Sequence, residues 1–314
     1  TQTFPDDTAV DTETTLLAND SGGVASLGTA AQLNPKGRGI YIVEIGTLNS
    51  AGEPTIHSSP VKLWDYVHDS TAASTDPNNP LFSIPSAVKA IDSDFDGYLD
   101  TVYVGDTGGN MWRFDIGHKV STSNWTGTKI FSSNPGNEGT PTNGRRILYP
   151  PAVVLESNFN GIYFGTGDRA HPLNQGVTER MYALFDRGQT TAKTEANMED
   201  VTLNELQFAA PAVAPPTCTA TNFSISCILE RIKAHTNYGW FIRLTDPGAD
   251  ATDRAGEKIL AEAAVFDGVA YYTSFQPNIT TTDACLAGNL GLSRVYAVKY
   301  LTGEAVFNFD TTND

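Results

Sequence analysis

Short apolar runs rich in Val, Ile, Tyr and Phe recur along the chain, and Gly, Asp, Asn and Pro repeatedly bound them. Runs of this length with such boundaries are typical of β-strands, because a helix needs a longer stretch with apolar positions every three to four residues. That longer periodicity is nearly absent, and the best helical candidate is the weakly patterned segment 194–208. The pattern therefore predicts an all-β fold, with extended loops in the polar stretches 1–30 and 66–80.

Several segments of the chain resemble one another, which indicates a repeat architecture. They span residues 38–52, 100–116, 160–186 and 267–307. The last three share an apolar strand with a central Tyr, a turn of Gly, Thr and Asp, and a second strand with an aromatic residue. Such a unit supplies two adjacent strands of an antiparallel four-stranded blade in a β-propeller. The spacing leaves room for one weaker blade, which we expect to hold residues 238–244. A β-sandwich also strings short strands together and is the alternative fold.

An acidic stretch, IDSDFDGYLDTVYVG at 91–105, places carboxylates at alternate positions. Neighbouring carboxylates this close repel by roughly 3–4 kcal/mol per pair at an effective dielectric near 20, so we expect a cation among them. Calcium prefers about six to eight hard oxygens, which a loop can supply from alternate residues around a tight turn such as Gly97. Tyr103 stands where such loops usually have a bidentate Glu. The predicted calcium ligands are Asp92, Asp94, Asp96, the carbonyl of Tyr98, and Asp100. A solvated acidic turn without an ion is the alternative.

Charge and cysteine content narrow the function further. The chain has 36 acidic and 20 basic residues, and its formal net charge is −16. Nucleic acids and anionic membranes bind positive surfaces, so neither is an expected partner. No apolar run approaches the roughly 18 residues of a membrane helix, and the chain starts without Met or a leader, so we expect a mature, exported piece without membrane insertion. In an exported protein we expect a local disulfide between Cys218 and Cys227, while Cys285 has no obvious partner.

The run from Asp92 to Ile116, DSDFDGYLDTVYVGDTGGNMWRFDI, resembles the C-terminal propeller domain of the PilY1 family of type IV pilus biogenesis factors, which includes the PilC adhesins. Further matching motifs are GIYFGTGDR (161–169), YGWFIRL (238–244), GEKIL (256–260), YYTSFQPN (271–278) and SRVYAVKYLTG (293–303). The matches cover most of residues 36–310. We therefore expect residues 36–314 to form the propeller domain and residues 1–35, which match poorly, to form an extended N-terminal segment.

This resemblance implies a modified seven-bladed β-propeller of quinoprotein type, exposed at the cell surface and the pilus tip. It also implies that the protein is not an enzyme. Members of the family regulate pilus extension and retraction and support attachment, in a calcium-dependent way, through the loop matched here by Asp92 to Asp100. The expected partners are pilin or minor pilins and surface or host receptors. The sequence has no Arg-Gly-Asp tripeptide, so the integrin binding attributed to some members is not expected here.

Two other classes of propeller are alternatives. A pyrroloquinoline quinone dehydrogenase needs an Asp base, an Arg near the quinone and a Trp that stacks on it, and the candidates are Asp168, Arg169 and Trp240. An acidic loop that holds its own ion is unlike the open metal of such an enzyme. An integrin-like propeller carries acidic loops in successive blades, whereas the motif occurs once in this sequence.

Overall fold

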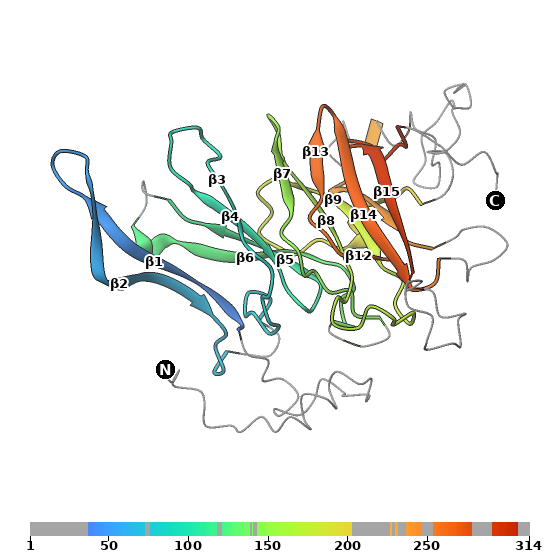
Figure 1. Cartoon of the computed structure of the whole chain (residues 1–314), viewed down its shortest axis with the longest axis horizontal. Coiled ribbons are helices and arrows are strands. Elements are labelled where there is room, and N and C mark those ends of the chain that lie inside the picture. Colours follow the sequence, from blue (N-terminus) through green and yellow to red (C-terminus); the bar gives the residue numbers. More distant parts are fainter. Residues whose placement is uncertain are drawn as a thin grey trace.

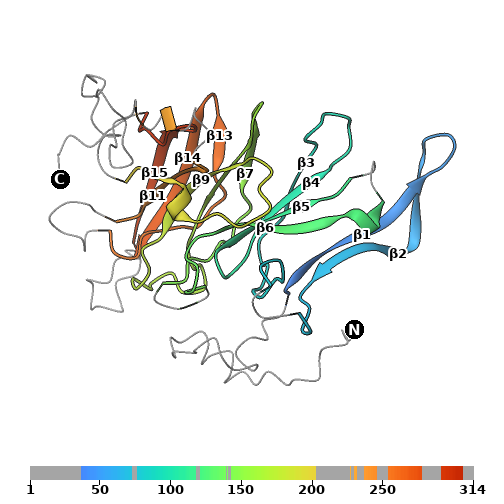
Figure 2. The same ribbon diagram turned by 180° about the vertical axis from the view of Figure 1, so that it is seen from behind.

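The described strands of this protein form four sheets that stand side by side in a row (Figures 1 and 2). The structure is a computed structural model, and it describes residues 37–72, 76–117, 121–138, 140, 143–202, 227, 230–231, 237–245, 254–277 and 291–306. The prediction of an all-β fold is confirmed. The segment 1–35, expected to be extended, lies outside the described residues.

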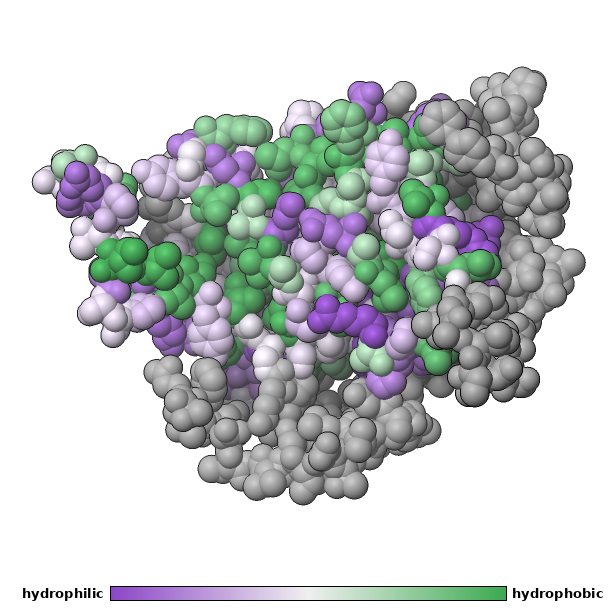
Figure 3. Space-filling model, in the orientation of Figure 1, coloured by the Kyte–Doolittle hydropathy of each residue, from purple (hydrophilic) through white to green (hydrophobic). Residues whose placement is uncertain are grey.

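The first sheet is a long two-stranded hairpin that projects from one end of the row (Figure 1). It consists of β1 (Gly39–Leu48) and β2 (Pro54–Val67), which pair antiparallel. One face, with Ile40, packs on the next sheet. Hydrophobic residues also gather on the visible side of this hairpin (Figure 3), and Tyr41 and Ile45 are 52% and 69% exposed. The hairpin therefore has apolar side chains that no described sheet covers. Residues 66 and 67 belong to β2, so the predicted loop 66–80 begins two residues later, at 68.

The second sheet is an antiparallel meander that holds the acidic loop. Its order is β3-β4-β5-β6. The strands are β3 (Lys89–Ile91), β4 (Thr101–Gly105), β5 (Asn110–Asp115) and β6 (Thr126–Ser132), with the 3-10 turn η2 (Thr122–Asn124) before β6. The repeat unit 100–116 thus forms two adjacent antiparallel strands, β4 and β5, as predicted.

The third sheet shows that the prediction of a separate blade at 238–244 is wrong. Its order is β10-β11-β9-β8-β7. The strands are β7 (Ala152–Leu155), β8 (Asn160–Gly165), β9 (Arg180–Asp186), β10 (Glu199–Asp200) and β11 (Gly239–Arg243). The unit 160–186 forms the predicted pair β8 and β9. Residues 238–244, however, do not form a separate blade, because β11 pairs antiparallel with β9 and so extends this sheet.

The fourth sheet closes the row at the other end. β14 pairs with each of the other strands in it, and the strands are β12 (Lys258–Ile259), β13 (Ala264–Phe266), β14 (Val269–Pro277) and β15 (Gly291–Lys299). The unit 267–307 therefore supplies the predicted adjacent pair, β14 and β15. Within the described residues no sheet closes on itself, and the number of blades stays a prediction.

Each hydrophobic cluster lies between two neighbouring sheets, so the sheets stack face to face. Strand β9 shows why. Met181 and Phe185 point into the cluster shared with the fourth sheet, whereas Tyr182 and Leu184 point into the cluster shared with the second sheet. Side chains alternate between the two faces of a strand, so a strand that is apolar throughout must be covered on both faces. This face-to-face stacking of small twisted sheets is the packing of a propeller.

The predicted helix at 194–208 is wrong where the structure describes it. Residues 195–197 form the 3-10 turn η3 (Glu195–Asn197), and strand β10 follows directly. Thr194 caps this turn, with its hydroxyl accepting from the N–H of Ala196. A cap of this kind starts a turn as readily as a helix, and the pairing of β10 with β11 then takes the backbone into a sheet. Residues 203–208 lie outside the described part.

Candidate metal-binding loop

The acidic loop is the connection between β3 and β4, and the strands hold both of its ends. Ile91 is the last residue of β3, and it pairs with Thr101, the first residue of β4. The N–H of Asp100 donates to the carbonyl of Ile91 at 3.0 Å, and the N–H of Ile116 donates to the carbonyl of Asp100 at 2.8 Å. Strand β4 is buried along its whole length. The loop is therefore an exposed turn on a rigid base.

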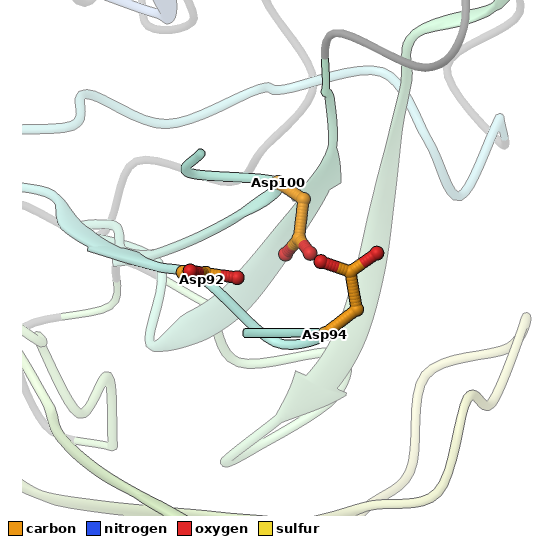
Figure 4. A group of neighbouring side chains, drawn as sticks. All are labelled: Asp92, Asp94 and Asp100. Carbon is orange, nitrogen blue, oxygen red and sulfur yellow. The ribbon is translucent and has the colours of Figure 1, made fainter. Parts of the chain in front are cut away.

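Carboxylates from both ends of the loop converge at this base. Asp92, Asp94 and Asp100 each offer one carboxylate oxygen, and these oxygens all lie within 4.8 Å of one another. Figure 4 shows the side chains of Asp94 and Asp100 turned toward each other. Asp94 is exposed, whereas the other two are partly buried. The group offers hard, negatively charged oxygens that solvent ions can reach, which is the donor set that calcium prefers.

Backbone turns make this convergence possible. The carboxylate of Asp92 accepts from the N–H groups of Asp96 at 3.2 Å and Gly97 at 2.8 Å, so the loop folds back over its own first residue. Phe95 and Gly97 have φ angles of 61° and 93°, in the left-handed region. Glycine adopts this region without strain, which explains its position at the tight turn of the motif.

Hydroxyl groups that the sequence analysis missed fix the third carboxylate. Asp100 accepts from the N–H of Ser93 at 3.1 Å, from the Ser93 hydroxyl at 2.9 Å and from the Thr101 hydroxyl at 2.9 Å. Ser and Thr are common in turns, so nothing in their spacing singled them out. Their contacts hold the Asp100 carboxylate in place, while its remaining lone pairs can still face an ion.

One of the predicted carboxylate ligands, Asp96, is not part of the converging group. The Asp96 carboxylate accepts from the N–H of Tyr98 at 2.9 Å, which makes a local turn. The converging group found within the described ranges comprises the other three carboxylates. The residues present thus fit a calcium ion in part, because three of the predicted carboxylates are assembled.

Trp240, the residue expected to stack on a quinone, is not accessible to one. Trp240 is fully buried in the cluster between the third and fourth sheets, and its indole N–H donates to the carbonyl of Tyr300 at 3.0 Å. Asp168 forms ion pairs instead, with Arg146 at 3.1 Å and with His171 at 2.9 Å. Arg169 lies over the ring of Tyr149. The three candidates therefore do not assemble a site in which a quinone could stack on Trp240.

Comparison with known proteins agrees with the fold. Residues 79–207, which include the whole acidic loop, match the PilY1 beta-propeller domain family. Over these residues the chain is similar to PilY1 propeller domains. A curated relative, the type IV pilus biogenesis factor PilY1 homolog of Xylella fastidiosa strain Temecula1, is 23% identical over 243 residues. This match covers 74% of the chain and 15% of the relative, so the chain spans only a small part of that protein's length.

A solved PilY1 domain has the same kind of fold. The crystal structure of the Pseudomonas aeruginosa PilY1 C-terminal domain superimposes with a TM-score of 0.50 at 15% sequence identity. The similarity covers 80% of this chain and 52% of that domain. The resemblance to PilY1 that the motifs predicted is thus confirmed. In the part of the chain that the structure describes, no helix is long and apolar enough to span a membrane.

Proposed function

We propose that this chain is part of a type IV pilus biogenesis factor of the PilY1 kind, whose β3–β4 loop binds calcium. In this proposal the protein acts at the pilus tip or the cell surface as a binding and regulatory component rather than as an enzyme. Its partners are pilin or minor pilins and the receptors to which the pilus attaches. In this proposal the propeller has the modified seven-bladed arrangement found in the PilY1 family. The convergence of Asp92, Asp94 and Asp100 at the base of the loop carries the proposal.

Calcium would be held by these three carboxylates, with the Asp96 carboxylate, the Tyr98 carbonyl and water as further ligands. Without an ion, like charges share a small space and repel one another. With an ion, the charges are compensated and the loop is tied to β3 and β4. The loop would then present one surface to a pilus partner with calcium and another without it, and differential affinity for these two surfaces is what regulation requires.

Calorimetry on the purified chain tests the site directly. We expect about one calcium ion per chain, and a loss of affinity of at least roughly tenfold in Asp94→Asn, which keeps the size of the side chain but removes its charge. Glu262→Gln is the matched control, because Glu262 is an exposed carboxylate in the connection between β12 and β13. Wild-type affinity in Asp94→Asn would refute the site. Asp96→Ala then decides whether the fourth carboxylate joins the ion.

Piliation in cells tests the role in regulation. The variants Asp94→Ala and Asp94→Lys are introduced into the full-length protein, and surface pili and twitching are measured with and without calcium. If charge compensation alone is the switch, the Lys variant supports piliation without calcium and the Ala variant does not. If ordered coordination is required, both variants lose piliation. Normal, calcium-responsive piliation in both variants would contradict the proposal.

The integrin-like alternative makes a different prediction for the same calorimetry. It requires acidic loops in successive blades and therefore several ions per chain. Within the described ranges, the acidic, His or Cys side chains placed to share a metal ion are Asp92, Asp94 and Asp100. A stoichiometry of three or more ions would favour the integrin-like alternative over a single regulatory loop.

A further inference from the structure

A small polar pocket lies where the second, third and fourth sheets meet. Its walls come from the connection between β6 and β7, from the loop between β8 and β9, and from β12. The lining residues are Thr140, Gly144, Arg146, Asp168, His171, Asn174, Val177, Glu179 and Lys258. Backbone hydrogen bonds tie these segments together. The N–H of Gly167 donates to the carbonyl of Arg146 at 3.0 Å, and the N–H of Ile259 donates to the carbonyl of Thr166 at 2.9 Å.

Glu179 places an unpartnered oxygen in this pocket. The residue is 2% exposed. The Thr166 hydroxyl hydrogen-bonds its carboxyl group. The second carboxyl oxygen, Oε2, is buried and has no hydrogen-bond partner. A buried charged oxygen without a partner is costly, so something must donate to Oε2 or remove its charge.

Lys258 faces the pocket but directs its hydrogen atoms elsewhere. Its Nζ donates to the carbonyls of Pro172 at 3.0 Å, Asn174 at 2.8 Å and Gly256 at 2.6 Å. An ammonium group has three hydrogen atoms, so all of them are used. The side chain of Lys258 therefore fastens β12 to the loop between β8 and β9 without satisfying Glu179.

The neighbouring arginines are committed as well. Arg145 donates to the carbonyl of Ser133 at 2.6 Å, and Arg145 and Arg180 each donate to Glu195 at 3.1 Å. Arg146 and His171 pair with Asp168 on the other side of the pocket. Because the surroundings of Glu179 are rich in basic groups, a metal cation is a poor occupant of this pocket.

We propose that Glu179 is a proton-binding site that locks the junction between the three sheets. With a proton on Oε2, the buried side chain is neutral and the junction is closed. Loss of the proton leaves a buried carboxylate whose basic neighbours, Lys258, Arg145 and Arg180, donate to other groups. The charge is relieved when water enters the pocket, which loosens the loop between β8 and β9 and the attached β12.

The direction of the pH effect follows from the burial of this carboxyl group. Burial raises the pKa of Glu179 from 4.5 to about 7, although the Thr166 hydroxyl and the charges of Lys258, Arg145 and Arg180 act to lower it. A group whose pKa is raised in the folded state holds its proton there and loses it in the unfolded state. The contribution to stability is complete below pH 4.5, falls as the pH rises toward 7, and is absent above that.

The test measures chemical unfolding of the chain between pH 5 and pH 8.5 in wild type, Glu179→Gln and the surface control Glu262→Gln. The amide of Glu179→Gln imitates the protonated carboxyl group and cannot titrate. We expect the folding equilibrium of wild type and of the control to weaken up to roughly tenfold per pH unit between pH 5 and 7, relative to Glu179→Gln. Parallel profiles for all three proteins would overturn the proposal.

Spectroscopy keeps the proposal testable if Glu179→Gln does not fold. Infrared difference spectra of the wild-type chain between pH 5.5 and 8.5 should show loss of a protonated buried carboxyl group, with a midpoint near pH 7. Hydrogen exchange in the loop 166–179 should accelerate over the same interval. A carboxyl midpoint below about pH 5, which would mean that an ordered water donates to an ionised Glu179, would refute the proton site.

Discussion

Arg113 of β5 and Asp186 of β9 form a buried ion pair across two neighbouring sheets, with Nη1 of the arginine 2.8 Å from Oδ1 of the aspartate. The Tyr103 hydroxyl donates to the same carboxylate at 2.7 Å, and the Asn160 amide donates to the Tyr103 hydroxyl at 3.0 Å. These contacts connect the strands on both sides of the junction. They fix the position of the sheet that carries the acidic loop relative to the sheet that follows it.

Removing each carboxylate partner of Arg113 in turn should distinguish a buried ion pair from an exposed one. We expect Asp186→Ala to lower the free energy of unfolding by about 3–5 kcal/mol, because Arg113 is left buried with fewer partners. Asp115→Ala removes the other carboxylate that pairs with Arg113, but its side chain is 46% exposed, so we expect a loss below about 1 kcal/mol. Urea denaturation of both variants measures the difference. Equal losses would contradict the structural role of Asp186.

Two glycines with nearly the same φ angle allow a second matched test. Gly109, in the turn between β4 and β5, has φ +80°, and an added Cβ would lie 2.1 Å from the carbonyl oxygen of Arg145. Gly136 has φ +82° and nothing within 4 Å of an added Cβ. Gly136→Ala should therefore cost only the left-handed conformation, about 1–2 kcal/mol. Gly109→Ala should cost roughly 2 kcal/mol more. Thermal or chemical unfolding that ranks the two variants equally would disprove the close approach.

Cys227 is buried and disulfide-bonded. Both possible partners, Cys218 and Cys285, lie outside the described residues, so the predicted pairing with Cys218 remains a prediction. A bridge that closes this short loop should stabilise the fold by about 3 kcal/mol, and Cys227→Ser should lose a similar amount. Peptide mapping without reduction identifies the partner. A peptide that links Cys227 to Cys285 would show that the expected local pairing is wrong.

Calcium should protect the acidic loop from proteolysis if the proposed site is correct. Phe95 and Tyr98 are 78% and 57% exposed; Phe95 lies between the predicted ligands Asp94 and Asp96, and Tyr98 is a predicted ligand through its carbonyl. Chymotrypsin should cleave after these aromatic residues in the absence of calcium, because cleavage requires a loop that can leave its resting conformation. Saturating calcium should slow cleavage by roughly tenfold in wild type and not in Asp94→Ala. Mass spectrometry measures the rate of cleavage. Equal rates for wild type with and without calcium would show that calcium does not order the loop.

Much of this protein could be predicted from local patterns. Strands β4, β5, β8, β9, β14 and β15 follow from apolar runs that contain an aromatic residue, because alternation and turn residues act over a few neighbouring positions. The spacing of the aspartates likewise predicts an acidic loop, because these residues lie close together in the sequence. The wrong prediction of a helix at 194–208 has the same origin in local pattern. Its local composition permits a helical start, and only pairing with a distant strand decides otherwise.

The chain sequence by itself determined the strand content, the repeat units and the acidic loop, because each depends on contacts between residues close in sequence. The tertiary structure decided the rest. Gly239 pairs with Leu184, more than fifty residues earlier, and this distant pairing makes residues 238–244 an extension of an existing sheet. The backbone of the loop turns Asp94 into the converging group but leaves Asp96 beside Tyr98. Glu179 looks like an ordinary surface residue in the sequence. Only the packing of three sheets around it removes the water that would otherwise keep it charged.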